Sequence, residues 1–470
     1  MRITFHGATR QVTGSSHLLD IGDHRILLDC GLYDSNRFDL DSPNRRMPFN
    51  PRSLDAVIVS HAHNDHIGRL PCLIRDGYTG PVYCTPATAE IMGIMLRDSA
   101  RIQREDLRHA FKRRPNPKDD PNREIRLADT PLFDFADVEL LLEALRPLDY
   151  GETIDLLPDI QLTLRNAGHI LGSAMVQLDF REHQRRRRFL FTGDLGRRNS
   201  GLLPDPEIVQ DIDILVTEST YGHKTLDPTH RLLKQLHAIL LRAHREAGKI
   251  IIPAFSLGRT QRMILVFQEL FQRYKVKPMP VFVDSPLGLK LTDIHRQFPD
   301  AYVPSARQLM DGDPDYFNNQ YVHFCYSFED SRRINFLPGP MVIVAGSGMC
   351  EAGRVRHHLR HAIQHDNNAI VIVSYQAEGT LGRQIAEGAE QVLIDDRWFD
   401  LNAAVYVLDG FSGHADRDDL AWWYSQIGGS IEHAFVVHGE PEAMQGAVEL
   451  LQPYVRNPVR MPELDESFEV

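Results

Sequence analysis

The chain has 470 residues, which is too many for one ordinary hydrophobic core and favours two domains. Its hydrophobic content of 42% and charged content of 25% are typical of a soluble globular protein, and no apolar run approaches the roughly 18 residues of a membrane-spanning helix. The net charge of −12 argues mildly against a polyanionic partner. That argument is weak, because screening over about 8 Å lets a local basic site act independently of the total.

Cysteine usage and the first residues predict a cytoplasmic protein. The five cysteines are an odd number and are scattered, with no Cys-x-x-Cys pair: Cys30, Cys72, Cys84, Cys325 and Cys350. This fits reduced thiols in a cytoplasm. The first ten residues, MRITFHGATR, lack the apolar core of a secretory signal, and we expect no membrane partner.

The first part of the chain predicts strands separated by tight turns. Four short segments bounded by Gly or Asp come first: RITFHGA, SHLLDIG, HRILLDCG and DAVIVS. We expect a helix over 85–111, a polar surface loop over 112–131 and a helix at VELLLEALRPL. A second strand group then follows: IQLTLRNAG, SAMVQLDF, RRFLFTGD and DILVTEST.

The pattern changes near residue 219, where strands begin to alternate with helices. A predicted helix over 229–247 is followed by the strand KIIIPAF and the helix GRTQRMILVFQELFQRY, and then by three further strands: PVFVDSP, PMVIVAGSG and NAIVIVSYQ. Such alternation indicates βαβ units and a parallel sheet. Short strands return after about residue 395. We therefore predict a first domain formed by 1–217 and 396–470, with an α/β domain inserted at 218–395.

The stretch VSHAHNDHIG crowds four potential metal ligands into six positions: His61, His63, Asp65 and His66. They follow the apolar strand DAVIVS, so they lie where that strand ends. One turn cannot close a metal site, and further ligands are expected at other strand ends: His169, Asp194 and His438. Histidine and carboxylate ligands suit zinc, with manganese or iron as competitors.

These residues, in this order and preceded by Asp29, resemble the metallo-β-lactamase superfamily, whose signature is His-x-His-x-Asp-His. The resemblance implies an α/β fold, in which two β-sheets pack face to face with helices outside. It implies two metal ions with separate ligands: His61, His63 and His169 for one, and Asp65, His66 and His438 for the other. Asp194 would bridge the two ions, and Asp29 would hold the ligand loop in place.

Three motifs indicate a branch of that superfamily. TESTYG places Glu218 just before the insertion, GFSGHAD places His414 after it, and VVHGE places His438 at the last strand end. This triple resembles the β-CASP nucleases, which include the pre-mRNA 3′-end endonuclease and related bacterial and archaeal ribonucleases. Members of this family that carry histidine at the last motif are similar to its RNA-acting branch, and this chain has His438 there. DSPLG and AGSGMCEAGR within the insertion also look like this family.

The chemistry of phosphodiester hydrolysis supports the same interpretation. Two metals supply a nucleophile from water at neutral pH and neutralise phosphoryl oxygens. Asp65 and Asp194 are therefore catalytic through the metals. Glu218 and His414 would form an acid pair, because a carboxylate beside an imidazole favours the imidazolium, which can donate a proton. The products would carry a 5′-phosphate and a 3′-hydroxyl.

Several further residues could contact the phosphates of a nucleic acid. The Gly-rich turn of AGSGMCEAGR, which contains Ser347 and Gly348, offers backbone N–H groups. Other candidates lie in neighbouring motifs: Arg259, Ser285 and Ser412. The arginine run 185–188 lies between two predicted strands, so we expect a hairpin tip in solvent. The histidines of RVRHHLRHAIQH lie among arginines on a helix that is expected to be solvated.

The sequence thus predicts a ribonuclease with two zinc ions that acts on single-stranded RNA in the cytoplasm. Its active site is expected in a cleft covered by the insertion, which would admit a single strand better than a duplex. One alternative is a hydrolase of a thioester or another small ester, which would not need Glu218 or His414. A second alternative is a non-catalytic RNA-processing scaffold. Endonuclease or 5′-exonuclease action, cleavage of DNA, and a homodimer all remain open.

Overall fold

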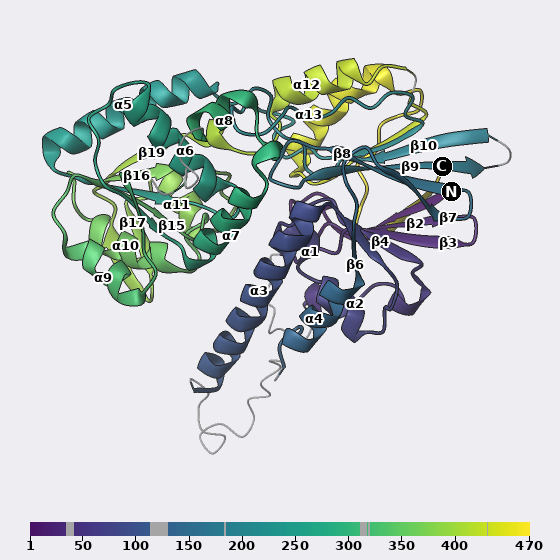
Figure 1. Ribbon diagram of the computed structural model, residues 1–470, viewed down its shortest axis with the longest axis horizontal. Coiled ribbons are helices and arrows are strands. Elements are labelled where there is room, and N and C mark those ends of the chain that lie inside the picture. Colours follow the sequence, from purple (N-terminus) through teal and green to yellow (C-terminus); the bar gives the residue numbers. More distant parts are fainter. Residues whose placement is uncertain (34–41, 113–129, 183–184, 311–316, 318–319, 430) are drawn as a thin grey trace. The chain divides into compact units, whose positions relative to one another are not determined.

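The computed structural model describes residues 1–470 except 34–41, 113–129, 183–184, 311–316, 318–319 and 430, so most of the predicted loop 112–131 lies outside the described residues. Contacts divide the chain into two compact units (Figure 1). The first unit comprises Met1–Arg198, Asp205–Thr225 and His414–Val470. The second unit comprises Asn199–Pro204 and Leu226–Gly413.

The first unit contains two β-sheets. A seven-stranded sheet has the order β21 (Glu466–Glu469), β1 (Arg2–Phe5), β2 (His17–Ile21), β3 (His24–Leu28), β4 (Ala56–Ile58), β5 (Val82–Cys84) and β6 (Leu145–Pro147). A six-stranded sheet has the order β20 (His433–Val436), β11 (Ile214–Thr217), β10 (Arg185–Phe191), β9 (Ala174–Glu182), β8 (Ile160–Asn166) and β7 (Thr153–Leu157). Apolar side chains from both sheets, such as Phe5 and Phe189, meet in one buried cluster. The sheets therefore pack face to face.

Helices complete the layers of the first unit. The helices α12 (Arg417–Gln426) and α13 (Pro441–Leu451) pack on the outer face of the six-stranded sheet through a buried cluster that includes Leu215, Trp423 and Met444. Figure 1 shows α1 (Asn64–Ile67), α2 (Leu70–Arg75), α3 (Pro86–Lys112) and α4 (Phe135–Ala144) beside the strands of the other sheet. This arrangement confirms the predicted α/β sandwich.

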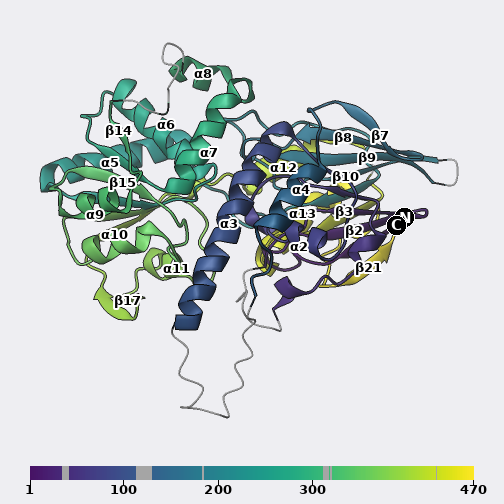
Figure 2. The same cartoon turned by 60° about the horizontal axis from the view of Figure 1, so that its bottom comes forward.

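The second unit is built on a parallel sheet in the order β14 (Val322–Phe324), β13 (Val281–Asp284), β15 (Met341–Ala345), β12 (Lys249–Pro253), β16 (Ala369–Ile372) and β19 (Ala404–Val407). Its helices are α5 (Thr229–Glu246), α6 (Arg259–Gln272), α7 (Pro286–Gln297), α8 (Pro304–Met310), α9 (Phe328–Phe336), α10 (Arg354–Ala362) and α11 (Leu381–Ala386) (Figure 2). Both faces of the sheet are covered. Ile250 and Ile252 of β12 pack in the cluster that contains α5 and α6, whereas Ile251 packs with α10 and α11.

The end of the second unit differs from the predicted limit at residue 395. The strand β19 pairs in parallel with β16, so the residues up to Gly413 group with the insertion. The first domain was expected to end at residue 217 before the insertion, whereas the first unit extends to Thr225. The residues of a short apolar strand such as AAVYV do not show which sheet the strand joins. The sequence-based prediction therefore placed it in the returning part of the first domain. A separate hairpin, β17 (Gln391–Ile394) with β18 (Arg397–Asp400), precedes this strand.

The arginine run 185–188 only partly fits the solvent-exposed hairpin tip that the sequence suggested. Arg185 and Arg186 are exposed, but all four residues lie within β10 and pair with β9. Arg187 is buried and forms a hydrogen bond with Glu182, and Arg188 forms one with Asp179. Part of the run is therefore a charged strand whose guanidinium groups pair with neighbouring carboxylates.

Candidate metal centre

Strand ends bring the candidate metal ligands together. The strand β4 ends at Ile58, and His61 and His63 follow before the single turn of α1, which carries Asp65 and His66. The strands β10, β11 and β20 are adjacent and parallel, so their carboxyl ends share one edge of the sheet. The residues that follow them are Asp194, Glu218 and His438.

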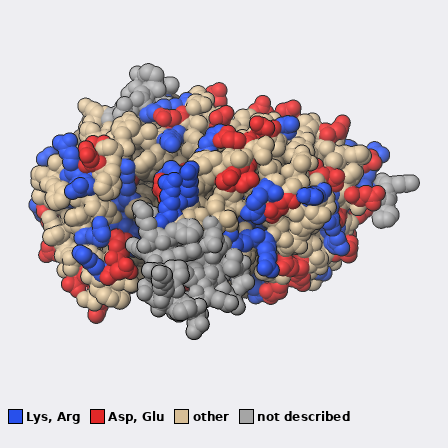
Figure 3. Space-filling model, turned by 90° about the horizontal axis from the view of Figure 1, so that it is seen from below, with Lys and Arg blue, Asp and Glu red and all other residues tan. Residues whose placement is uncertain are grey.

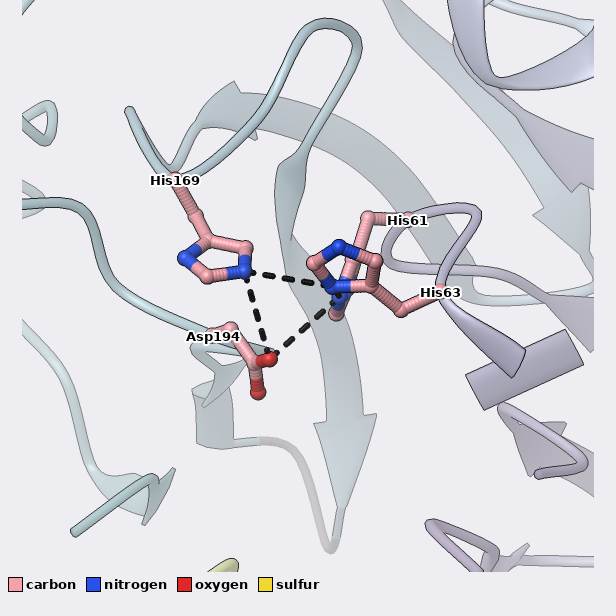
Figure 4. Close-up of side chains that lie close together, drawn as sticks. All are labelled: His61, His63, His169 and Asp194. Carbon is pink, nitrogen blue, oxygen red and sulfur yellow. Dashed lines mark hydrogen bonds and ion pairs between the residues drawn. The ribbon is translucent and has the colours of Figure 1, made fainter. Parts of the chain in front are cut away.

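One group of ligands consists of His61, His63, His169 and Asp194, whose ligand atoms lie within 4.8 Å of one another. Figure 4 shows the four side chains pointing toward one another. The Nδ1 atom of His63 lies 3.0 Å from His61 Nε2 and 3.3 Å from His169 Nε2. Asp194 Oδ2 lies 3.3 Å from His61 Nε2 and 3.6 Å from His169 Nε2. Three imidazoles and a carboxylate thus face a common point.

A second group consists of Asp65, His66 and His438. His438 Nε2 lies 3.4 Å from His66 Nε2 and 3.3 Å from Asp65 Oδ2. The other oxygen of Asp194, Oδ1, lies 3.3 Å from His66 Nε2 and 3.6 Å from His438 Nδ1. Asp194 therefore offers one carboxylate oxygen to each group.

The environment of Asp194 fits a carboxylate that binds cations. The side chain is buried, and neither oxygen accepts a hydrogen bond from the described part of the chain. A buried carboxylate without hydrogen-bond donors is costly unless a positive charge compensates it. Histidine and aspartate donors suit zinc, so the residues present fit the metal centre that the sequence predicted.

Burial also sets the protonation of several histidines. It lowers the pKa of His63 to about 3 and lowers the pKa values of His61 and His169, which favours neutral imidazole, the form that binds metals. Burial opposes the charged form of His66 as well, but the charges of Asp194 and Asp29 outweigh it and raise that pKa well above its usual value. Two carboxylates thus surround His66, whereas the other three imidazoles crowd one another.

Asp29 lies behind the ligand loop, where the sequence resemblance placed it. Its Oδ2 atom is 2.7 Å from His66 Nδ1, which turns Nε2 toward the centre. Ser60 donates to Asp29 through both its N–H and its hydroxyl, at 2.8 Å each, and Ser15 donates from 3.2 Å. The sequence analysis missed both serines. Ser60 directly precedes His61, which was the available signal.

Glu218 and His414 form the expected pair. His414 Nδ1 lies 3.3 Å from Glu218 Oε1, and the fully buried carboxylate also accepts hydrogen bonds from the N–H groups of Leu195 and Thr220. Burial disfavours the charged form of His414, but Glu218 outweighs it and the pKa of His414 is raised. The Thr220 hydroxyl lies 3.1 Å from His438 Nδ1 and was also missed.

The geometry leaves two roles for His414. Asp194, His414 and His438 form a third group of potential ligand atoms within 4.8 Å of one another. His414 Nδ1, however, lies 3.9 Å from Asp194 Oδ2 and closer to Glu218. A ligand role and a proton-donor role therefore make different predictions for metal content.

The predicted phosphate contacts follow the carboxyl ends of adjacent strands in the second unit. Arg259 follows β12, Ser285 follows β13, and Ser347 with Gly348 follows β15. The Ser285 hydroxyl lies 2.9 Å from that of Ser256 and accepts a hydrogen bond from the Gly288 N–H at the start of α7. Ser412 is buried and follows β19, which lies at the opposite edge of the sheet from β14.

Three family models match the chain. The metallo-β-lactamase superfamily matches residues 9–254, the Beta-Casp domain matches 260–385, and a Zn-dependent metallo-hydrolase RNA specificity domain matches 398–462. The chain belongs to the β-CASP family of the metallo-β-lactamase superfamily. The predicted family and fold class are thereby confirmed, and this β-CASP protein is a metallo-hydrolase by family.

Similar proteins agree with this placement. Ribonuclease TTHA0252 of Thermus thermophilus is 34% identical over 453 residues, covering 96% of each chain. Transcription termination factor FttA of Methanocaldococcus jannaschii is 33% identical, covering 94% of this chain and 67% of its own length. A crystal structure of a protein of unknown function from Enterococcus faecalis shares the fold, with a TM-score of 0.53, 14% identity and 99% coverage of both chains.

Two properties of the β-CASP protein concern membranes and charged partners: the character of its helices and the charge of its surface. Within the residues that the structure describes, no helix combines the length and the apolar character needed to cross a bilayer. On the face drawn in Figure 3, basic and acidic side chains are interspersed, so the net charge of −12 does not make that face uniformly acidic.

Proposed function

We propose that this β-CASP protein is a ribonuclease that hydrolyses phosphodiester bonds of single-stranded RNA. The observation that carries the proposal is the position of Asp194, which offers one oxygen to each of two ligand groups beside the Glu218–His414 pair. The matched RNA specificity domain and the relative named a ribonuclease favour RNA as the substrate.

The ligand groups suit two zinc ions per chain, with manganese or iron as alternatives. His61, His63 and His169 would hold one ion, and Asp65, His66 and His438 the other, with Asp194 contributing to both. When bound, the ions would supply a nucleophile from water at neutral pH and neutralise charge on the phosphoryl oxygens.

The protein's own residues would orient the site and move one proton. Asp29 and Ser60 hold His66 so that Nε2 faces the centre. Glu218 holds His414 through Nδ1, which leaves Nε2 as the atom that donates a proton to the departing 3′-oxygen. The water oxygen would remain on phosphorus, so the products would carry a 5′-phosphate and a 3′-hydroxyl.

Backbone and hydroxyl groups of the second unit would contact RNA phosphates. Ser285, Ser347 and Gly348 are the first candidates because they follow adjacent parallel strands. The guanidinium of Arg259 and the hydroxyl of Ser412 complete the proposed set. A location of the active site in a cleft covered by the insertion stays a prediction, as do the cytoplasmic location and a homodimer.

The test uses end-labelled single-stranded RNA, single-stranded DNA and a thioester substrate with the same metal-loaded preparation. We expect cleavage of the RNA, loss of cleavage with a chelator, and recovery when zinc is restored. Fragment patterns from 5′- and 3′-labelled RNA would separate endonuclease from 5′-exonuclease action. Thioester hydrolysis without RNA cleavage would instead support the small-ester hydrolase, and no hydrolysis of any substrate would favour a scaffold.

A further inference from the structure

A stripe of four exposed or half-buried rings crosses the helices α9 and α10 of the second unit; we call it the ring stripe, and it consists of Phe328, His357, His361 and Phe336. Successive ring centroids are 6.3, 4.9 and 5.8 Å apart. Phe328 and Phe336 are 62% and 75% exposed. Figures 1 and 2 both show α9 beside α10, and the two helices are in contact. Two phenylalanines this exposed contribute little to the core and need another explanation.

Cationic groups act on the two histidines of the ring stripe, although acidic residues follow Phe328, and Asp395 pairs with Arg360. Arg332 is exposed and is four residues from both phenylalanines along α9, so it lies on the same side of the helix. Arg360 lies 2.9 Å from His357 Nδ1 through Nη2. Burial and the nearby cationic groups, including Arg332 and Arg360, lower the pKa of His357, and burial with Arg360 lowers that of His361. The lowered pKa values favour neutral imidazoles, and exposed Arg332 supplies positive charge beside them.

The helices that carry the ring stripe are tied to the strand end that precedes Ser285. The helix α9 starts just after β14, which is adjacent and parallel to β13. Buried Asp284, the residue before Ser285, bonds to Arg354 and His358 of α10. Arg354 also donates to the carbonyl of Cys325. This network fixes α10 and the segment before α9 to the end of β13, where Ser285 follows.

We propose that the ring stripe is a base-stacking platform for single-stranded RNA. The inference rests on the proposed function, because it extends the RNA contacts of the same unit. Bases stack on exposed aromatic rings, and arginines between them attract the phosphates. A protein partner would also cover exposed phenylalanines, but the cationic groups that act on the central histidines, with exposed Arg332 between the phenylalanines, favour a polyanion. The four rings are spread along two helices, as a single strand would require.

The test measures RNA affinity in variants of the metal-loaded full chain. The probe is a fluorescein-labelled oligouridylate of about 12 nucleotides, within the range of single-strand sites. Anisotropy is recorded by stopped-flow mixing before cleavage. Phe328→Ala and Phe336→Ala should each weaken binding by about 5- to 100-fold, the effect typical of one lost stacking contact. Phe328→Tyr and Phe336→Tyr, which keep the aromatic rings, should retain most of the wild-type affinity for RNA.

A matched control is Tyr274→Ala, which removes another exposed ring of the same unit, just after α6, and should leave the affinity unchanged. Arg332→Gln should weaken binding and make it less dependent on salt, by about 0.7 in the slope of log affinity against log salt. Circular dichroism spectra would show that the variants remain folded.

Unchanged RNA affinity in the Phe328→Ala/Phe336→Ala double variant would overturn the proposal. A change of molecular mass by light scattering, without a change in RNA affinity, would overturn it in favour of an interface between proteins. RNA affinity is measured by stopped-flow anisotropy before any phosphodiester bond is cleaved. Failure of RNA cleavage would therefore contradict the proposed ribonuclease activity, while the affinity comparison would still test the ring stripe.

Discussion

Two histidine clusters in this molecule look alike in sequence and differ in structure. His61, His63 and His66 are spaced closely in one turn, and His357 with His361 is spaced by four residues on α10. The first cluster meets buried carboxylates from other strand ends, whereas the charged groups nearest the second are cationic. Close spacing of histidines therefore does not make a metal site. Convergence with buried carboxylates from distant parts of the chain is what distinguishes the candidate metal ligands.

The largest expected effect comes from the residue that joins the two ligand groups. Asp194→Ala should reduce metal content from about two ions per chain to less than one and abolish RNA cleavage, because one carboxylate serves both ions. Elemental analysis of dialysed protein is the measurement. The matched control is His357→Ala/His361→Ala, which should keep the metal content of the wild type. Loss of metal in that control would contradict the distinction between the clusters.

His414 tests whether every histidine near the centre is a ligand. His414→Ala should keep about two metals and cleave RNA roughly 10²–10⁴-fold more slowly, as expected for a lost general acid. A substrate with sulfur in place of the 3′-bridging oxygen needs little protonation of its leaving group. His414→Ala should therefore recover most of its relative rate on this substrate, whereas His438→Ala should stay slow on both. Loss of metal from His414→Ala would instead assign it as a ligand.

Asp29 separates a residue that orients a ligand from the ligands themselves. Asp29→Asn keeps the shape of the side chain but weakens its bond to His66, so metal affinity should fall by about 10- to 100-fold. Competition with a chromophoric chelator measures this change. Raising the zinc concentration should restore cleavage in Asp29→Asn but not in His414→Ala. Equal behaviour of the two variants would contradict the assigned roles.

The smallest effect is expected from the arginine run of β10. Arg185→Gln removes an exposed side chain that pairs with Asp213 and Glu432, so the free energy of unfolding should change by less than about 1 kcal/mol. Urea unfolding measures this change. RNA affinity should be unaffected, in contrast to Arg332→Gln on the ring stripe. A tenfold loss of RNA affinity in Arg185→Gln would show that the neutralised strand also binds RNA.

The candidate ligands could be selected from the sequence because each one follows a strand closely and belongs to a motif. Strand ends are visible in sequence as a change from apolar to polar residues, so His169, Asp194 and His438 could be found. Ser15 and Thr220 could not be singled out, since a serine or threonine has no distinguishing pattern until a buried partner is placed beside it, whereas the position of Ser60 before His61 was a signal that the sequence did carry. The sheet joined by β19 depends on pairing with β16, which is a contact between distant segments. The partners of Arg187 and Arg188 were equally invisible, because Glu182 and Asp179 face them only once β9 and β10 pair.

The proposed mechanism requires that water, and not the ribose 2′-hydroxyl, attacks phosphorus at this centre. Single-stranded RNA should be cleaved by the zinc-loaded protein in water enriched in oxygen-18, and the fragment ends analysed by mass spectrometry. We expect one heavy oxygen on each new 5′-phosphate and an unlabelled 3′-hydroxyl on the other fragment. A 2′,3′-cyclic phosphate, or a 5′-end without the label, would contradict it.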